Sequence, residues 1–212
     1  YFLKTKKITT DTRNISKDCI FFALKGANFN GNQFAEKAIE NGALAAIVDE
    51  KEFENTSKNI FYVNDSLEAL QDLARAYRNY LKIPFIGLTG SNGKTTTKEL
   101  ISSVLKEKFK VHYTYGNLNN HIGVPLTILS IPDETEIAVI EMGANHKKEI
   151  ELLCTISQPD FGYITNFGKA HLEGFGGFEG VIRGKSELYE YLRNNNKIAF
   201  VNLEDPIQIE KT

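Results

Sequence analysis

The sequence predicts an α/β protein in which short parallel strands alternate with helices. Six apolar runs have the length of buried strands, at 20–24, 44–48, 60–63, 85–88, 137–140 and 161–165. Segments with apolar residues at helical spacing lie between several of these runs. A glycine-rich turn at 90–93 joins one run to one such segment. Strand, glycine turn and helix in this order form a phosphate-binding arrangement.

The first segment, residues 1–82, contains three of the predicted strands. A helix is expected around 34–39, and Asn41 and Gly42 end it. Ser66 is the expected N-cap of a second helix. The apolar face of that helix comprises Leu67, Leu70, Leu73, Ala74 and Tyr77. Because the residue before a proline is biased away from helix, Lys82-Ile83-Pro84 is the expected domain boundary.

The second segment, residues 83–212, alternates strands and helices from the run at 85–88 onward. A helix follows Gly93, with Leu100, Ile101, Val104 and Leu105 at helical spacing, and another is expected around 150–156. Such alternation implies a mostly parallel sheet with helices on both faces. Ligands of these sheets bind at the carboxyl ends of the strands, so polar residues just after each strand are candidate site residues.

The turn Gly90-Ser91-Asn92-Gly93-Lys94-Thr95-Thr96 is the strongest functional signal in the chain. In such a P-loop Lys94 would reach the β- and γ-phosphates of a nucleotide, and the Thr95 hydroxyl would hold Mg²⁺. The general motif has glycine at the position of Leu88, so this is a shortened form. The alternative is an ordinary Gly-Asn turn before a helix. The preceding strand and the Lys-Thr pair favour ATP or GTP binding.

Composition narrows the classes of function. The chain has 212 residues, of which 42% are hydrophobic, and a formal net charge of −2. This balance argues against general binding to nucleic acids or anionic membranes. No apolar run approaches the ~20 residues of a membrane span. Cys19 and Cys154 lie far apart without a C-x-x-C spacing, so a reducing cytoplasm is expected.

Three polar residues outside the P-loop are candidates for metal chemistry. Glu141 follows the strand at 137–140, where an acidic residue commonly completes a nucleotide-Mg²⁺ site; taken alone, it is a solvated loop residue. His171 is either a metal ligand or a hydrogen-bonding loop histidine. Lys185 lies inside the apolar stripe of a helix. Its amine either extends to solvent or is held in a polar pocket, where desolvation favours the neutral form that can react with CO₂ to give an anionic carbamate.

Taken together, these motifs resemble the Mur ligases of peptidoglycan synthesis. The matching stretches are Gly90-x-x-Gly93-Lys94-Thr95-Thr96, Glu141 to Asn145, and Thr165-Asn166 through His171 to Lys185. Glu141-Met142-Gly143 and the segment 117–125 resemble the members that add D-alanyl-D-alanine to UDP-N-acetylmuramoyl-tripeptide. In the first segment, residues 10–13, 21–26 and 29–31 resemble the domain that holds the UDP end of this substrate. The likeness extends from about Ile8 to Asn202.

The resemblance implies a role for each matching residue. Lys94 would contact the phosphates of ATP, Thr95 and Glu141 a first Mg²⁺, and His171 with a carbamylated Lys185 a second Mg²⁺. In this context carbamylation of Lys185 is favoured over extension to solvent. The implied catalytic residues are Lys94, Asn166, His171 and Lys185. The implied UDP-substrate-binding residues are Thr10, Asp11, Thr12, Arg13, Lys25, Gly26, Asn119 and Asn120. His121 replaces an acidic residue of the family, which leaves its role open.

The implied reaction is ATP-dependent amide formation. A substrate carboxylate attacks the γ-phosphate of ATP, and the amine of D-alanyl-D-alanine then attacks the acyl phosphate. The resemblance implies a UDP-substrate-binding domain at 1–82, an incomplete central ATP-binding domain at 83–212, and a C-terminal domain for the amine that this chain lacks. We expect a cytoplasmic monomer. One alternative is a non-catalytic module that binds UDP-substrate and nucleotide. Another is a related amide ligase of the tripeptide-forming or folate-polyglutamylating type, and the UDP-domain motifs weigh against the folate type.

Overall fold

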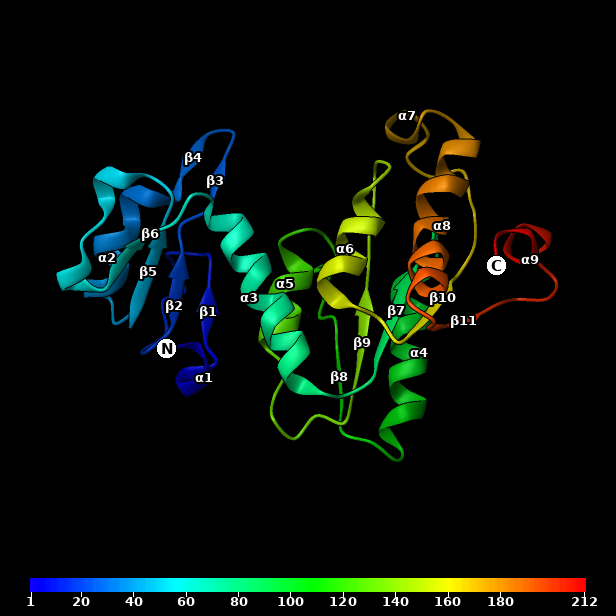
Figure 1. The fold of residues 1–212 in the computed structure, drawn as a ribbon, viewed down its shortest axis with the longest axis horizontal. Helices are drawn as coiled ribbons and strands as arrows, with labels where there is room; N and C mark the ends of the chain where they lie inside the picture. Colours follow the sequence, from blue (N-terminus) through cyan, green and yellow to red (C-terminus); the bar gives the residue numbers. More distant parts are fainter. The chain divides into compact units, whose positions relative to one another are not determined.

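The computed structural model describes all residues from 1 to 212 and contains two compact units (Figure 1). One unit comprises Tyr1–Leu73 and the other Ala74–Thr212. The division falls within helix α3 (Ser66–Leu81), ahead of the expected boundary at 82–84. The second half of α3 belongs to the second unit because Tyr77 Oη donates to Ile131 O at 2.8 Å and Arg78 Nε donates to Ser157 O at 2.9 Å.

The first unit is built on a four-stranded parallel sheet in the order β1-β2-β5-β6. The strands are β1 (Ile8–Thr9), β2 (Ile20–Phe22), β5 (Ala45–Val48) and β6 (Ile60–Tyr62), and β3 (Lys25–Gly26) with β4 (Phe29–Asn30) forms a separate antiparallel pair. Its helices are α1 (Phe2–Thr5), η1 (Gly31–Phe34), α2 (Ala35–Glu40), η2 (Lys51–Phe53) and η3 (Thr56–Lys58). The three expected strands and the expected helix at 34–39 are confirmed, and Phe21, Val48 and Ile60 lie in the core.

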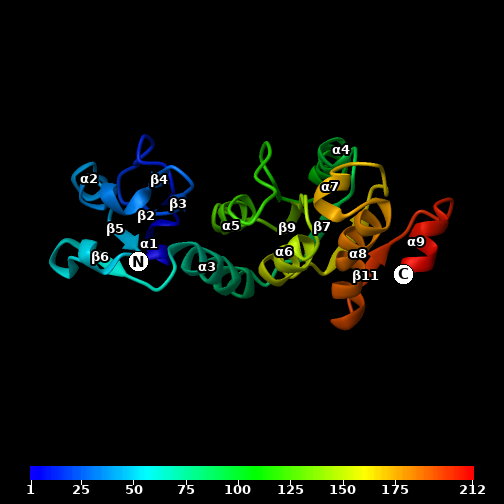
Figure 2. The same cartoon turned by 90° about the horizontal axis from the view of Figure 1, so that it is seen from above.

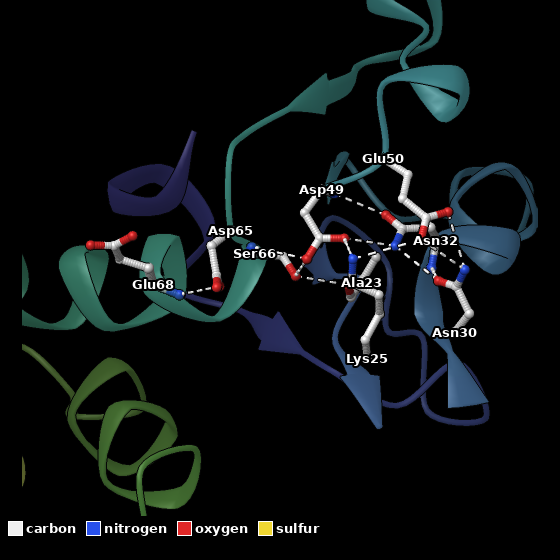
Figure 3. A network of polar contacts seen from close by, with 9 residues as sticks. All are labelled: Ala23, Lys25, Asn30, Asn32, Asp49, Glu50, Asp65, Ser66 and Glu68. Carbon is white, nitrogen blue, oxygen red and sulfur yellow. Dashed lines mark hydrogen bonds and ion pairs between the residues drawn. The ribbon is translucent and has the colours of Figure 1, made fainter. Parts of the chain in front are cut away.

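The N-terminus of α3 differs from the expectation by one residue. Ser66 is not the N-cap, because the preceding Asp65 accepts a hydrogen bond from Glu68 N at 2.9 Å (Figure 3). The Ser66 hydroxyl instead donates to Ala23 O at 2.8 Å. Ser66 therefore fixes α3 to the end of β2 and does not cap its own helix.

The second unit contains a five-stranded parallel sheet in the order β11-β10-β7-β9-β8. The strands are β7 (Phe85–Thr89), β8 (Val111–Tyr113), β9 (Ile137–Glu141), β10 (Phe161–Ile164) and β11 (Ile198–Phe200). The register pairs Leu88 of β7 with Glu141 of β9 and with Tyr163 of β10. The carboxyl ends of these three strands therefore lie together at one edge of the sheet.

Helices cover both faces of this sheet, as expected. On one face α4 (Lys94–Lys106) packs on β7, β8 and β9. The opposite face carries α5 (Gly123–Leu129), α6 (Glu149–Ser157) and α8 (Phe178–Asn194). Figure 2 shows α4 and α6 on opposite sides of β7 and β9. Two shorter helices, α7 (Leu172–Phe175) and α9 (Pro206–Lys211), complete the unit. None of the helices is long and apolar enough to cross a membrane.

The apolar stripe of α4 is only partly buried. Leu100 and Val104 are 63% and 72% exposed, although the helix itself forms as predicted. Together with Ile86 and Tyr163 they line an open apolar groove. The reason is that α4 packs on β7, β8 and β9, and the groove beside it is lined by Tyr163 of β10 and Phe200 of β11.

Candidate active site

The P-loop follows β7 and ends at the N-terminus of α4, as the sequence predicts. Gly90 and Gly93 have φ angles of 144° and 75°, which residues with a side chain rarely adopt. A Cβ atom at Gly90 would also overlap Thr165 Oγ1, in the loop after β10. Leu88 is fully buried within β7, which continues to Thr89. The first glycine of the turn therefore falls at Gly90, which explains the shortened motif.

Asn166 holds the P-loop from the neighbouring loop. Its Nδ2 donates to Asn92 O at 3.0 Å, and Asn92 N donates to Asn166 Oδ1 at 3.2 Å. Ser91 N donates to Asn166 O at 3.1 Å. These bonds give Asn166 a supporting role in the P-loop, and its direct participation in catalysis stays a prediction.

The side chain of Lys94 folds back over the loop that precedes it. Its Nζ donates to Gly90 O at 2.8 Å. Burial lowers the pKa of Lys94, and the charge of Glu141 partly offsets this effect. A phosphate oxygen is a better acceptor for this amine than a carbonyl oxygen. Lys94 is thus placed to bind a phosphate held by the P-loop, and Thr95 and Thr96 follow it in the exposed first turn of α4.

Glu141 is the last residue of β9 and only 1% exposed. Its Oε1 accepts hydrogen bonds from Asn119 Nδ2 at 2.9 Å and from Thr95 Oγ1 at 3.4 Å. Its Oε2 is buried and has no hydrogen-bond partner. A buried carboxylate oxygen without a partner is destabilising. The geometry therefore favours a cation or a donor beside this oxygen.

The oxygen atoms of Thr95 and Glu141 fit a Mg²⁺ ion. Magnesium prefers oxygen donors, and Glu141 Oε2 is an available carboxylate ligand beside the P-loop. No three His, Cys, Asp or Glu side chains of the chain gather into a metal cluster. A magnesium ion at Glu141 would complete its coordination with nucleotide phosphates and water, as Mg²⁺ commonly does.

Gly143 allows Asn119 to reach the Glu141 carboxylate. Gly143 N donates to Asn119 O at 2.7 Å. A Cβ atom at Gly143 would lie 2.8 Å from Asn119 Oδ1, closer than real Cβ contacts occur. The glycine of the Glu-Met-Gly motif thus leaves room for the amide that orients Glu141. The structure engages Asn119 within this site, whereas the sequence predicts a contact with the UDP-substrate.

Lys185, in the middle of α8, is buried with its amine bound to a main-chain carbonyl oxygen. It is 2% exposed, and its Nζ donates to Ala144 O at 3.1 Å and lies 5.2 Å from the centroid of the Phe175 ring. The alternative of an amine extended to solvent is therefore wrong. Burial, followed by the charge of Lys94, lowers the pKa of Lys185 to about 8. The neutral amine is more accessible as a result, and carbamylation of Lys185 stays a prediction.

One cavity joins the P-loop to the loop that binds Lys185. His171, at the start of α7, lines this cavity of about 520 Å³ together with Lys94, Asn119 and Ala144. The main-chain oxygen of Ala144 is also the acceptor of the Lys185 amine. The structure thus brings the predicted phosphate-binding and metal-binding residues to one edge of the five-stranded sheet.

Asn120 has a local structural role. Its Oδ1 accepts hydrogen bonds from Ile122 N at 3.1 Å and Gly123 N at 2.8 Å, so the side chain initiates α5. Asn120 and His121 both line the cavity. The contact of Asn120 with UDP-substrate stays a prediction, and the structure gives His121 a place in the cavity without a defined function.

In the first unit, residues 10–13 follow the carboxyl end of β1. Asp11 accepts hydrogen bonds from the Arg13 main-chain N at 2.9 Å and from the Arg13 guanidinium at 2.8 Å. The hydrogen bonds from Arg13 lower the pKa of Asp11 to about 2. Thr10 and Thr12 are half-buried beside this pair. Their expected contact with the uridine end of the substrate stays a prediction.

Lys25, also expected at the UDP-substrate, belongs to a network at the carboxyl end of β5 (Figure 3). Its Nζ lies 3.0 Å from Asp49 Oδ1 and 3.6 Å from Glu50 Oε1. Asp49 is in turn fixed by Asn32 Nδ2 at 2.8 Å and by Ser66 Oγ at 3.1 Å. Lys25 thus lies at the same sheet edge as residues 10–13, and its binding of UDP, like that of the adjacent Gly26, stays a prediction.

The sequence analysis did not single out three buried charged residues of the second unit, Arg78, Lys98 and Glu187. Lys98 of α4 is 1% exposed, and Glu187 of α8 accepts hydrogen bonds from Lys148 N at 2.6 Å and Glu151 N at 2.9 Å, at the start of α6. Lys98 precedes Ile101 by three residues, on the same stripe of the helix. Lys98, like Lys185, is therefore a lysine within the apolar stripe of a helix, which is a signal visible in the sequence.

Comparison with known proteins gives two matching family models. The model described as "Mur ligase family, catalytic domain" matches residues 4–78, and the model of the Mur ligase middle domain matches residues 88–212. Together they cover both compact units.

Two curated relatives of this chain share a name. A protein named UDP-N-acetylmuramoyl-tripeptide–D-alanyl-D-alanine ligase from Bacillus subtilis is 43% identical over 95% of this chain and 44% of its own length. The protein of the same name from Escherichia coli is 39% identical over 93% of this chain and 43% of its own length. The chain thus spans less than half the length of these relatives.

Solved structures agree with these sequence matches. A crystal structure of MurF from Acinetobacter baumannii has a TM-score of 0.88 and 38% identity, covering 97% of this chain and 45% of that one. The structure of MurF ligase from Thermotoga maritima in complex with ADP has a TM-score of 0.89 and 37% identity, covering 100% of this chain and 48% of that one.

Proposed function

The chain belongs to the Mur ligase family, and from this premise we propose that it is the UDP-substrate-binding and nucleotide-binding part of an ATP-dependent ligase. The reaction would join D-alanyl-D-alanine to UDP-N-acetylmuramoyl-tripeptide, the substrates in the names of its relatives. The observation that carries the proposal is the Glu141 carboxylate, whose Oε1 lies 3.4 Å from Thr95 Oγ1 and whose Oε2 is buried without a partner. Because the chain spans less than half of those relatives, turnover is proposed for a longer protein that contains it.

In the proposed reaction a substrate carboxylate oxygen attacks the γ-phosphorus of ATP, which gives an acyl phosphate and ADP. The amine of D-alanyl-D-alanine then attacks the acyl carbon, phosphate leaves, and the nitrogen loses a proton as the amide forms. Lys94 would bind the β- and γ-phosphate oxygens and reduce the repulsion between the two anionic reactants. Thr95 and Glu141 would hold Mg²⁺, which supplies further charge neutralisation when bound.

For the second proposed Mg²⁺, the chain supplies His171 and Lys185. We propose that Lys185 carries a carbamate, formed when its neutral amine adds to CO₂ and releases a proton. This change would turn a cation into an anionic oxygen ligand, which suits Mg²⁺. The enclosed position of Lys185 beside the Ala144 carbonyl supports the proposal, because it limits hydration of the charged amine.

The domain assignment, site of action and assembly follow from the same proposal. Residues 1–82 would bind the UDP end of the substrate, residues 83–212 would bind ATP, and the amine-binding domain would lie outside this chain. The protein would act as a cytoplasmic monomer. Two buried cysteines without a disulfide, Cys19 and Cys154, are consistent with a reducing compartment.

Two measurements test the proposed function. A fluorescent ADP analogue should bind the chain with Mg²⁺-dependent affinity, and Glu141→Gln should remove most of that dependence. Phosphate release from ATP, UDP-N-acetylmuramoyl-tripeptide and D-alanyl-D-alanine should occur in a longer protein that includes the C-terminal domain. Binding that ignores Mg²⁺ and Glu141 would refute the site assignment.

Two alternative functions can be distinguished from the proposed one by experiment. One is a non-catalytic module that binds UDP-substrate and nucleotide as the function of these 212 residues by themselves. Robust turnover by the chain alone would exclude that function. Selective binding of a folate over UDP-N-acetylmuramoyl-tripeptide would instead indicate a folate-polyglutamylating ligase.

A further inference from the structure

We propose that Lys98 is a positioning residue for the Glu141 carboxylate and acts through the segment Thr114–Asn119. The proposal rests on the proposed function, since it assumes that Glu141 holds the Mg²⁺ of a nucleotide. It adds a residue of α4 whose amine binds the main chain at Thr114, directly after β8.

Lys98 is buried against the last residue of β8 and the residue that follows it. Its Nζ donates to Thr114 O at 2.6 Å and lies 5.5 Å from the centroid of the Tyr113 ring. The carboxylate of Glu99, 3.1 Å away, supplies a counter-charge. A buried lysine amine is destabilising unless it is paired and hydrogen-bonded. These partners therefore account for the place of Lys98 and join α4 to the start of the loop at 114.

Thr114 transmits this contact to Glu141. The Thr114 hydroxyl oxygen accepts a hydrogen bond from Glu141 N at 2.9 Å, and Thr114 N donates to Val139 O at 3.0 Å. Thr114 is fully buried, so no water competes for these bonds. Thr114 thus accepts the Lys98 hydrogen bond with its carbonyl oxygen, and its side chain binds the main-chain N of Glu141.

The other end of the segment holds the carboxylate itself. Asn119 Nδ2 donates to Glu141 Oε1 at 2.9 Å. Glu141 is therefore bound at its main chain by Thr114 and at its side chain by Asn119, the two ends of one short loop. Lys98 anchors the beginning of that loop to α4.

The same helix carries the other proposed magnesium ligand. Thr95 precedes Lys98 by three residues in α4, and its Oγ1 lies 3.4 Å from Glu141 Oε1. The contact between Lys98 and Thr114 therefore sets how closely α4 and the end of β9 approach. Without the amine, the distance between Thr95 and Glu141 would no longer be fixed. The P-loop and Lys94 would stay in place.

The test is the Mg²⁺ dependence of nucleotide binding by the full chain. Lys98→Met keeps the aliphatic stem and removes the amine. We expect the Mg²⁺ concentration for half-maximal binding of a fluorescent ADP analogue to rise about 10- to 100-fold, the usual effect of losing a residue that supports a metal ligand. Affinity for the analogue without Mg²⁺ should stay within about twofold of wild type, since the phosphate-binding loop is untouched.

Lys106→Met is the matched control. Lys106 lies on the same helix, and its amine lies 4.3 Å from the centroid of the same Tyr113 ring and 3.2 Å from the Tyr113 hydroxyl. It is exposed, and its amine binds the Tyr113 side chain, whereas that of Lys98 binds the Thr114 main chain. The Mg²⁺ requirement of this variant should match wild type, which separates the proposed effect from general loss of a lysine on α4.

Thr114 provides a second, independent pair of variants. Thr114→Val removes the acceptor for Glu141 N and should raise the Mg²⁺ requirement as Lys98→Met does, whereas Thr114→Ser keeps that acceptor and should resemble wild type. The Lys98→Met/Thr114→Val double variant should be no worse than the stronger single one, because both act through one path. If Lys98→Met fails to fold, as judged by circular dichroism, the Thr114 pair decides.

A lower melting temperature with an unchanged Mg²⁺ requirement in Lys98→Met, or in Thr114→Val, would overturn the proposal and leave Lys98 a stabilising residue only. Wild-type binding that does not respond to Mg²⁺ would overturn the proposed function together with this inference. The two failures are thus distinguished by the behaviour of the wild-type chain.

Discussion

Replacing Gly143 with alanine should weaken the proposed magnesium site without unfolding the protein. The new Cβ atom would lie 2.8 Å from Asn119 Oδ1, whereas ordinary contacts begin at 3.4 Å, so the amide has to move by about 0.6 Å. The φ angle of Gly143 is outside the left-handed region, so alanine introduces no backbone strain. The Asn119 side chain therefore has to move, and the 2.9 Å hydrogen bond from Asn119 to Glu141 is lost.

The size of the effect follows from the charge of the acceptor. A hydrogen bond to a charged group contributes about 1.5–3 kcal/mol. At about 1.4 kcal/mol per factor of ten, this corresponds to a roughly 10- to 100-fold higher Mg²⁺ requirement. The melting temperature should change little, because no buried apolar contact is removed.

The assay is a Mg²⁺ titration of nucleotide binding, run beside thermal unfolding. Lys147→Ala, at an exposed position of the same loop, is the control and should behave as wild type. Asn119→Ala should raise the Mg²⁺ requirement as Gly143→Ala does, and the double variant should add nothing further. A wild-type Mg²⁺ requirement in Gly143→Ala would refute the argument that this glycine makes room for the orienting amide.

Three further predictions concern phosphate binding, carbamylation and acid stability. Lys94→Ala should abolish ATP hydrolysis in a longer, active protein, because the phosphate-binding amine is lost; near-normal phosphate release would contradict its assignment. Lys185→Ala should lose activity in the same protein and regain part of it with a small carboxylic acid, and the absence of any rescue would count against the carbamate. Asp160 binds Arg78 and Lys197, each at 2.7 Å. Burial raises the pKa of Asp160, but the Lys197 and Phe85 hydrogen bonds and the neighbouring charges bring it below its ordinary value. Asp160 therefore binds a proton more readily in the unfolded chain than in the folded one. Its ion pairs stabilise the folded state at neutral pH, and this contribution is lost as the pH falls below about 4. Urea unfolding at neutral and acid pH measures this effect. The free energy of unfolding should fall less in acid for Asp160→Asn than for wild type, and an equal fall in both proteins would contradict the prediction.

The nucleotide-binding elements could be predicted because their signals are local. The strands at 85–88 and 137–140 are continuous apolar runs, and the turn at 90–93 has glycines where the structure has positive φ angles. The position of Lys185 in an apolar stripe was also a local signal, and the structure places its amine at a carbonyl oxygen inside the protein.

Other elements left weak local signals. β1 has two residues and β8 has three, which is too few to show the two-residue alternation of a strand. β8 also has the polar residue His112 at its centre. Helix α5 begins where Asn120 binds the main chain at Ile122 and Gly123, and it contains Pro125 in its first turn. Short elements of this kind depend on packing against neighbours for their stability.

The amino-acid pattern alone was sufficient for the fold class and the P-loop, since each depends on neighbours within a few positions. The partners of Glu141 and Lys98 depended on the tertiary structure. Sheet order places β9 between β7 and β8, which brings Thr95, Thr114 and Asn119 around Glu141 from separate parts of the chain. Packing also left Leu100 and Val104 of α4 exposed, because burial depends on which element lies opposite and not on helical spacing.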